Sequence, residues 1–281
     1  MWRCARRCLE GYGVTVEHEL SGAETDRSPQ LRGRPQASIG RIIFGCLSLS
    51  LWHGTKWLVI AGVTVVAGYA LVLVLLRFVD PPSSMLMVQR KLAGTEIAQY
   101  WVPLDRISSN LINAVVVSED ARFCEHSGID FRELEQAMEK AAERGDLTAR
   151  GASTISMQVI KNMFLWSDRS FVRKGLEFVM TPTMELVWPK RRILEIYLNI
   201  AEWGPGVFGA EAAARYHFDK TARQLTAREA ALLAVSLPNP FERVAGEPGR
   251  ALRQRARTIE TRMASAARYT RCVQKLSAQA R

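Results

Sequence analysis

Two adjacent carboxylates, Glu119 and Asp120, follow the apolar run Val115–Val117, with Ser118 between. A carboxylate beside apolar surface can have a raised pKa, and such a group can act as a general acid or base. A helix that ends in solvent shows the same pattern, and position alone favours this ordinary interpretation. Other residues must therefore decide whether the pair is catalytic.

A second candidate site lies between Gly151 and Asn162, where glycine and hydroxyl residues precede a helical pattern. The first backbone N–H groups of a helix are free to bind an anion. Thr154, Gln158 and Lys161 would lie on one face of this helix, at positions i, i+4 and i+7. The stripe suits a phosphate group, and an ordinary capped helix explains it equally well.

Basic and bulky apolar residues are interleaved from Arg169 onward. Arg173 and Lys174 precede Glu177, and Arg173 and Glu177 have the i, i+4 spacing of a helical ion pair. With apolar neighbours such as Phe171, this segment suits a surface that meets lipid and phosphate together. Core residues beside solvated cations give the same composition.

Three helices are expected to position these residues. Apolar periodicity predicts one over roughly 109–119 and another over roughly 189–202. A third begins at Thr226, with Glu229 three residues later as a capping box, and runs to about residue 238. Alternating strand patterns are scarce, so the chain is predicted to be mainly helical.

The 281 residues carry a formal net charge of +10 and a sequence pI of about 9.7. Such a charge suits nucleic acid, an anionic membrane or a polyanionic substrate. No nucleic-acid-binding motif accompanies it, so a nucleic-acid partner is not expected.

The five cysteines are odd in number and irregular in spacing, which argues against a zinc site or a disulfide scaffold. Only Cys124 and Cys272 follow the apolar segment described next. A disulfide between these two is an alternative that their loose context disfavours.

Residues 57–76 form an uncharged apolar segment, which as a helix of about 30 Å would cross a bilayer. We predict a transmembrane helix here, within an anchor at residues 41–79. Residues 1–40 are polar and without periodicity, which predicts a disordered tail. Flanking arginines and lysines favour a cytoplasmic N-terminus, with the larger remainder on the other side of the membrane.

Taken in order, the candidate residues resemble the successive motifs of the biosynthetic peptidoglycan glycosyltransferases (glycosyltransferase family 51). The resemblance covers roughly residues 85–242 and is closest to the monofunctional members. No Ser-x-x-Lys or Lys-Thr-Gly motif is present, so a transpeptidase domain is not expected. The motifs are Glu119-Asp120-x-x-Phe123-x-x-His126-x-Gly128, Gly151-x-Ser153-Thr154-Ile155-x-x-Gln158-x-x-Lys161-Asn162, Arg173-Lys174-x-x-Glu177 and Lys190-x-x-Ile193-Leu194-Glu195-x-Tyr197-Leu198-Asn199.

The resemblance implies a mainly α fold: a lysozyme-like glycosyltransferase domain with a smaller membrane-apposed lobe, preceded by a single transmembrane helix. The glycosyltransferase domain is assigned to residues 80–250 and a basic helical C-terminal tail to residues 251–281. The expected location is the bacterial inner (cytoplasmic) membrane, with the catalytic domain in the periplasm.

The implied reaction is cell-wall peptidoglycan synthesis from lipid II, with inversion to a beta-1,4 bond and release of undecaprenyl pyrophosphate. The implied partners are lipid II, the growing lipid-linked glycan and the membrane; division or elongation proteins are further candidates. An inactive membrane scaffold is an alternative, and so is a lysozyme-like hydrolase, which the phosphate-suited cations disfavour.

By resemblance, Glu119 is the base, and Glu177 is a second catalytic carboxylate that either orients cations or holds Mg²⁺ or Mn²⁺ at the pyrophosphate. The expected substrate-binding and pyrophosphate-binding residues are Ser153, Thr154, Gln158, Lys161, Asn162, Arg169, Arg173 and Lys174. The motif residues expected to hold the structure are Asp120, Phe123, His126, Gly128, Gly151, Glu195, Tyr197 and Asn199.

Met157 departs from the family pattern, which usually has two adjacent glutamines at this point. Methionine removes a hydrogen-bond donor and an acceptor. Either that side chain is dispensable or the substrate contact is weaker, and this departure is the feature that points toward the scaffold.

Overall fold

The computed structural model describes residues 39–143, 145, 152–168 and 170–274, and the chain divides into two compact units, Met1–Ala70 and Leu71–Arg281. The predicted disordered tail falls almost wholly outside the described residues. Helix α2 spans Ile39–Leu76. Within α2, Gly54–Leu76 has 23 residues and a mean hydropathy of 2.6, and among the described residues it is the one helix able to cross a membrane by length and composition.

The last turns of α2 belong to the second unit and are fastened there by backbone contacts. The indole Nε1 of Trp188 donates to the carbonyl of Leu73 at 2.6 Å, and Arg192 Nε donates to the carbonyl of Leu76 at 3.0 Å. The carbonyl of Leu73 also accepts from the N–H of Arg77, so the indole adds a second hydrogen bond to it. The end of α2 is therefore fixed to the start of α8 (Lys190–Ile200).

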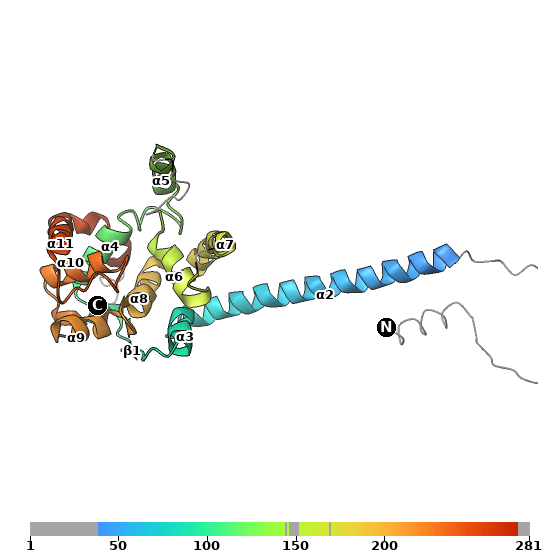
Figure 1. Ribbon diagram of the computed structural model, residues 1–281, viewed down its shortest axis with the longest axis horizontal. Coiled ribbons are helices and arrows are strands. Elements are labelled where there is room, and N and C mark those ends of the chain that lie inside the picture. Colours follow the sequence, from blue (N-terminus) through green and yellow to red (C-terminus); the bar gives the residue numbers. More distant parts are fainter. Residues whose placement is uncertain (1–38, 144, 146–151, 169, 275–281) are drawn as a thin grey trace, which may run out of the picture. The chain divides into compact units, whose positions relative to one another are not determined.

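The second unit is built almost entirely of helices (Figure 1). Single-turn 3₁₀ helices at Leu104–Arg106, Ala222–Gln224 and Ala266–Arg268 connect some of them. Besides α8, its α-helices are α3 (Met85–Leu92), α4 (Ser109–Glu119), α5 (Phe131–Glu143), α6 (Ile155–Phe164), α7 (Phe171–Val187), α9 (Ala210–Phe218), α10 (Ala227–Ser236), α11 (Arg250–Met263) and α12 (Arg271–Gln274).

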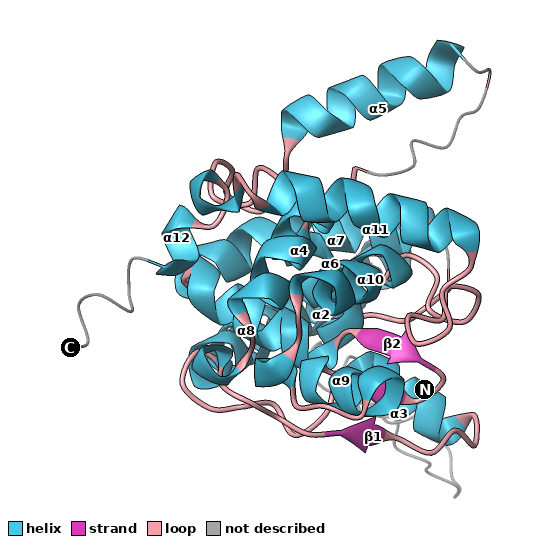
Figure 2. Ribbon diagram, turned by 90° about the vertical axis from the view of Figure 1, so that its left-hand side faces the viewer, coloured by secondary structure: helices cyan, strands magenta, loops and turns pink. Residues whose placement is uncertain are grey.

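Helix α4 lies at the centre of the core. It packs against α10 and α11, while α6 packs against α7 and α8 (Figure 2). The buried residues of α4 include Leu111, Ala114 and Val115–Val117, so the helix is apolar over most of its surface. A helix buried on nearly all sides is held firmly in place, and α4 therefore gives Glu119 a rigid support.

The three predicted helices are present, and local signals account for their ends. α4 begins and ends at the predicted residues, with Ser108 as its N-cap. α10 begins after Thr226, whose capping box with Glu229 is formed as predicted. α8 is shorter at both ends than the predicted 189–202, because Pro189 is the N-cap and a short strand begins at Glu202.

The small sheet has the strand order β1 (Ala98–Gln99), β3 (Val207–Phe208), β2 (Glu202–Gly204). β1 pairs with β3 in parallel, with Ala98 opposite Val207, and β2 pairs with β3 antiparallel. Strands this short carry too few residues to show alternation, which explains why the sequence pattern did not indicate them.

The structure also differs from the predicted boundary at residue 250. Helix α11 buries Leu252, Ala256 and Ile259 and packs against both α4 and α10. This helix is therefore part of the second unit and not a separate basic tail; its arginines occupy only the outer side. Residues 275–281 lie outside the described residues.

Candidate active site

Glu119 is the last residue of α4, where the buried helix meets the loop that begins at Asp120. Its Oε2 accepts a hydrogen bond from Gln158 Nε2 at 2.9 Å. Burial raises the pKa of the Glu119 carboxyl, while the Gln158 amide and the nearby charge of Lys161 oppose that rise. The result is a stronger base than an ordinary solvated carboxylate.

Gln158 is held from both ends of its amide. Tyr197 donates its hydroxyl to Gln158 Oε1 at 3.1 Å, which leaves Nε2 to face Glu119. Burial raises the pKa of Tyr197 well above its ordinary value, so the phenol stays protonated and remains a donor. The three side chains form a chain of donors that ends on the Glu119 carboxylate.

Gln158→Leu removes the hydrogen bond that lowers the pKa of Glu119. That pKa should therefore rise further, and the acid limb of the kcat/KM profile should move to higher pH. The matched control is Tyr197→Phe, which frees the other end of the amide and leaves the Glu119 contact in place. An acid limb that moves equally in both variants would contradict this assignment.

A cluster of cations lies near Gln158. Glu177 is buried and forms ion pairs with Arg173 and with Lys174, whose Nζ is 3.0 Å from Oε2. Lys174 also donates to the Ser153 hydroxyl at 3.0 Å, so the segment before α6 is fastened to α7.

Lys161 belongs to the same electrostatic group. Burial lowers the pKa of its ammonium, and the charges of Arg173 and Lys174 lower it further, while Glu177 raises it. A bound anion would stabilise the charged form of all three cations. The cluster therefore has the chemistry of a site for a phosphate-type group.

The donor set does not fit a metal site built by the protein. Both oxygens of Glu177 face cations, and metal ligands are normally grouped carboxylates, histidines or thiolates. No group of three or more such side chains able to hold a metal occurs in the described part of the chain.

One residue expected to touch the substrate, Thr154, also has a structural role. Thr154 is the N-cap of α6: its hydroxyl accepts from Met157 N at 3.1 Å and donates to the carbonyl of Gly128 at 2.5 Å. Thr154 is buried and its hydroxyl has both partners, so this side chain caps α6, while the residue also borders a cavity beside Glu119. Gly151 and Arg169, also predicted here, lie outside the described residues.

Met157 is part of the apolar core, with only 1% of its surface exposed. A methionine fills such a space without leaving a polar group unsatisfied. Met157 therefore does not lie on the surface where a substrate would bind. Its difference from the family pattern no longer favours an inactive scaffold.

The loop after Glu119 is held by one hydrogen-bonded pair. The Asp120 carboxylate lies 3.0 Å from His126 Nε2 and accepts from the backbone N–H of Ile155 at 3.0 Å. His126 Nδ1 accepts in turn from the N–H of Gly128 at 3.1 Å. These bonds join the end of α4 to the start of α6, and Phe123 packs in the core beside them.

Gly128 has a φ of +96°, and a Cβ built on it would lie 2.7 Å from Thr181 Cγ2. Gly128→Ala should therefore lower the free energy of unfolding by more than the roughly 1–2 kcal/mol of an unfavourable backbone conformation alone. The control is Gly94→Ala, where φ is +83° and a Cβ would meet nothing within 4 Å. Urea denaturation of both variants would measure the difference, and equal losses would exclude the steric contribution.

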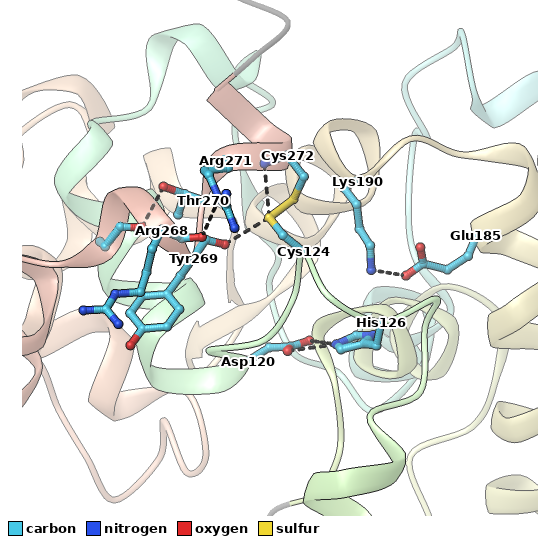
Figure 3. Close-up of a disulfide and its surroundings, with 11 residues drawn as sticks. Asp120, Cys124, His126, Glu185, Lys190, Arg268, Tyr269, Thr270, Arg271 and Cys272 are labelled. Atoms are coloured by element: carbon cyan, nitrogen blue, oxygen red, sulfur yellow. Dashed lines mark hydrogen bonds and ion pairs between the residues drawn. A yellow bond between two sulfur atoms is a disulfide. The ribbon is translucent and has the colours of Figure 1, made fainter.

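The structure contradicts the expectation that Cys124 and Cys272 stay unpaired: they form a disulfide, with Cα atoms 5.6 Å apart (Figure 3). Cys124 lies in the loop between Asp120 and His126, and Cys272 lies in α12. Helices α11 and α12 bring Cys272 back to this loop, a contact across 148 residues that cysteine spacing cannot indicate.

Glu195 and Asn199 form hydrogen bonds to backbone groups, and Glu195 also forms an ion pair with Arg192. Glu195 Oε2 accepts from the N–H of Leu104 at 2.9 Å. The Asn199 amide exchanges two hydrogen bonds of 2.9 Å with the backbone of Val102. These contacts fasten residues 102–104 to α8, whereas the Tyr197 side chain on the same helix reaches the site.

Three cavities surround Glu119 and Gln158. Cavity A, of about 370 Å³, is lined by residues that include Gln158, Lys161, Asn162, Tyr197, Trp166, Arg90 and Phe241. Cavity B, of about 280 Å³, is lined by residues that include Glu119, Asp120, Arg122, Asp130, Ser153 and Arg262. Cavity C, of about 270 Å³, is lined by Ser118, Glu119, Val235, Pro238, Arg243, Arg255, Thr258 and Ile259.

Glu119 lines cavities B and C, and its partner Gln158 lines cavity A. The predicted residues Glu119, Gln158, Lys161 and Ser153 are thus brought to one connected surface. Arg243 and Arg255 were missed, because they come from segments without a motif and reach Glu119 only through the fold.

The second unit is thus a mostly helical domain with a half-buried carboxylate and a group of cations suited to an anion. The family model described as "Transglycosylase" matches residues 87–264, more than half of the chain.

Proteins with the curated name "Biosynthetic peptidoglycan transglycosylase" give the same assignment. The protein from Rhodospirillum centenum is 55% identical over 205 residues, covering 71% of this chain and 88% of its own. That from Agrobacterium fabrum is 47% identical over 199 residues, covering 70% and 86%, and that from Jannaschia sp. is 51% identical over 181 residues, covering 64% and 73%. The chain belongs to the transglycosylase family, which confirms the resemblance of its motifs.

Proposed function

We propose that this protein is a peptidoglycan polymerase that elongates glycan chains from lipid II and has no transpeptidase activity. The observation that supports the proposal best is the half-buried Glu119, hydrogen-bonded to the fixed amide of Gln158 and close enough to Lys161 for the two charges to interact. The printed names of the relatives point to the same polymer.

In the proposed reaction, Glu119 removes the proton from the 4-hydroxyl of the acceptor sugar. An alcohol is a weak nucleophile near neutral pH, so a positioned base with a raised pKa accelerates its attack. The hydroxyl oxygen forms a bond to the anomeric carbon of the donor, and the bond from this carbon to the pyrophosphate breaks. Attack from the opposite face inverts the alpha linkage to beta-1,4.

The leaving pyrophosphate takes the electron pair and carries growing negative charge. Lys161, Arg173 and Lys174 are suited to stabilise that charge, with Ser153 as hydrogen-bonding support. Glu177 orients two of these cations through its ion pairs. In this proposal Glu177 acts on the leaving group indirectly, by positioning its partners.

Two features support a site at the surface of the inner membrane. The span Gly54–Leu76 would hold the domain close to lipid-linked substrates. Helix α7 also exposes a row of apolar side chains on one side, suited to contact with lipid. These are Phe171, Val172, Leu176, Val179 and Leu186.

The Cys124–Cys272 disulfide supports a periplasmic catalytic domain, because disulfides persist in the oxidising periplasm and are rare in the reducing cytosol. This agrees with a single-pass topology in which the N-terminus is cytoplasmic. Division or elongation proteins remain proposed partners on the basis of the reaction alone.

The test is polymerisation of labelled lipid II in detergent by the purified protein, with products separated by gel electrophoresis. We expect long glycan products. Muropeptides released from purified cell wall, with no polymer from lipid II, would instead identify a hydrolase. A well-folded protein that does neither would overturn the proposal in favour of the scaffold.

A further inference from the structure

Cavity C has a charge pattern that the proposed chemistry does not use. Two arginines, Arg243 and Arg255, face it together with Glu119, and its other lining residues are neutral. Neither arginine belongs to the cluster of Lys161, Arg173 and Lys174. Cavity B, on the other side of Glu119, is lined by carboxylates as well as arginines and has no comparable excess of positive charge.

Arg243 is held in a defined position. Its Nη1 donates to the carbonyl of Val235 at 3.1 Å, at the end of α10, and its other guanidinium donors stay available. Its positive charge acts on Glu119, whose pKa it lowers. The guanidinium is therefore close to the carboxylate that we propose as the base.

Arg255 lies on the side of α11 that borders cavity C. Thr258 and Ile259, three and four residues later, line the same cavity, as expected for one face of a helix. The buried residues Leu252 and Ala256 fix this helix against α4 and α10. Arg255 itself is exposed and makes no hydrogen bond or ion pair with another described residue.

Stability does not explain such an arrangement. Neither arginine forms an ion pair with another described residue that would offset the repulsion between them, although Glu242 and Glu247 line a neighbouring cavity together with both. Two guanidinium groups that face one cavity are suited to a carboxylate, which accepts paired hydrogen bonds from a planar donor.

We propose that Arg243 and Arg255 bind a carboxylate of the peptide that the substrate carries, and so position the reacting sugar beside Glu119. This inference rests on the proposed function, since a peptide joined to a sugar through its amino end keeps a free carboxyl group. Cavity C lies next to the reacting atoms because Glu119 lines it. The arginine pair makes the enzyme selective for peptide-bearing sugars.

The test compares Arg255→Gln with Arg257→Gln. Arg257 is exposed on the same helix but lines none of the three cavities, so its substitution controls for the loss of one charge. Polymerisation is measured with lipid II and with lipid II whose peptide carboxylates are amidated. We expect Arg255→Gln to lower kcat/KM about fivefold to tenfold for lipid II, mainly through KM. It should have no further effect on the amidated substrate, and Arg257→Gln should change neither value.

A loss of the same size with both substrates would overturn the proposal and show that Arg255 serves the pyrophosphate. No loss with either substrate would overturn it as well. A binding titration tests the arginine pair without requiring polymerisation, so it can be interpreted even if the proposed function is wrong. In this titration a soluble disaccharide-peptide without lipid or pyrophosphate should bind the wild type about fivefold to tenfold more tightly than Arg255→Gln, and amidation should abolish the difference.

Discussion

Glu119→Gln is expected to reduce the rate of glycan polymerisation by about 10²- to 10⁴-fold, the contribution typical of a general base. Glutamine has nearly the same shape and can still accept the hydrogen bond from Gln158, so the change removes the basic oxygen with little other disturbance. The measurement is the initial rate of lipid II polymerisation. The matched control is Glu135→Gln, the same chemical change at an exposed position of α5.

The stability of the same variant gives an independent check on folding. Burial raises the pKa of Glu119 in the folded protein, so the folded state binds the proton more tightly than the unfolded state. Stability due to this group is then present at low pH and falls as pH rises. Glu119→Gln should therefore have a higher Tm than the wild type at pH 7, and the difference should vanish below about pH 4. Full activity with this Tm pattern would exclude Glu119 as the base.

Loss of the Cys124–Cys272 disulfide is expected to lower the free energy of unfolding by about 2–5 kcal/mol. The bond closes a loop across 148 residues, which restricts the unfolded chain strongly. In the folded protein it also ties the loop after Glu119 to α12, so activity should fall together with stability.

The measurement is the Tm of the wild type with and without a thiol reductant, compared with that of the double variant Cys124→Ser, Cys272→Ser. The reductant should lower the Tm of the wild type to about that of the double variant and should leave the double variant unchanged. A wild-type Tm that does not respond to complete reduction would show that the bond does not stabilise the fold.

Sequence patterns predicted the features that depend on neighbouring residues. The ends of α4 and the start of α10 follow from apolar spacing and from the capping residues Ser108 and Thr226, all within one or two helical turns. The family was recognised for a related reason, because the motifs around Glu119 are compact in sequence.

Features that depend on the return of distant segments could not be predicted in this way. The partner of Cys124 lies on α12. Arg243 lies in the connection after α10 and Arg255 lies on α11, yet both line a cavity with Glu119. The burial of Thr154 is another example. Its position at the start of α6 follows from the sequence, but the hydrogen bond from its hydroxyl to the carbonyl of Gly128 does not. That bond depends on the packing of the loop after Glu119.

The position of the disulfide also affects how the enzyme matures. For a chain that crosses the membrane with its N-terminus held back, Cys124 emerges well before Cys272, which lies 148 positions further along the chain, and the bond must wait for it. The loop beside the proposed base is thus secured only after nearly the whole domain has been exported. A chain stalled in export would carry a free thiol next to Glu119 and an unsecured catalytic loop. The last covalent step of biogenesis would then also be the step that completes the active site.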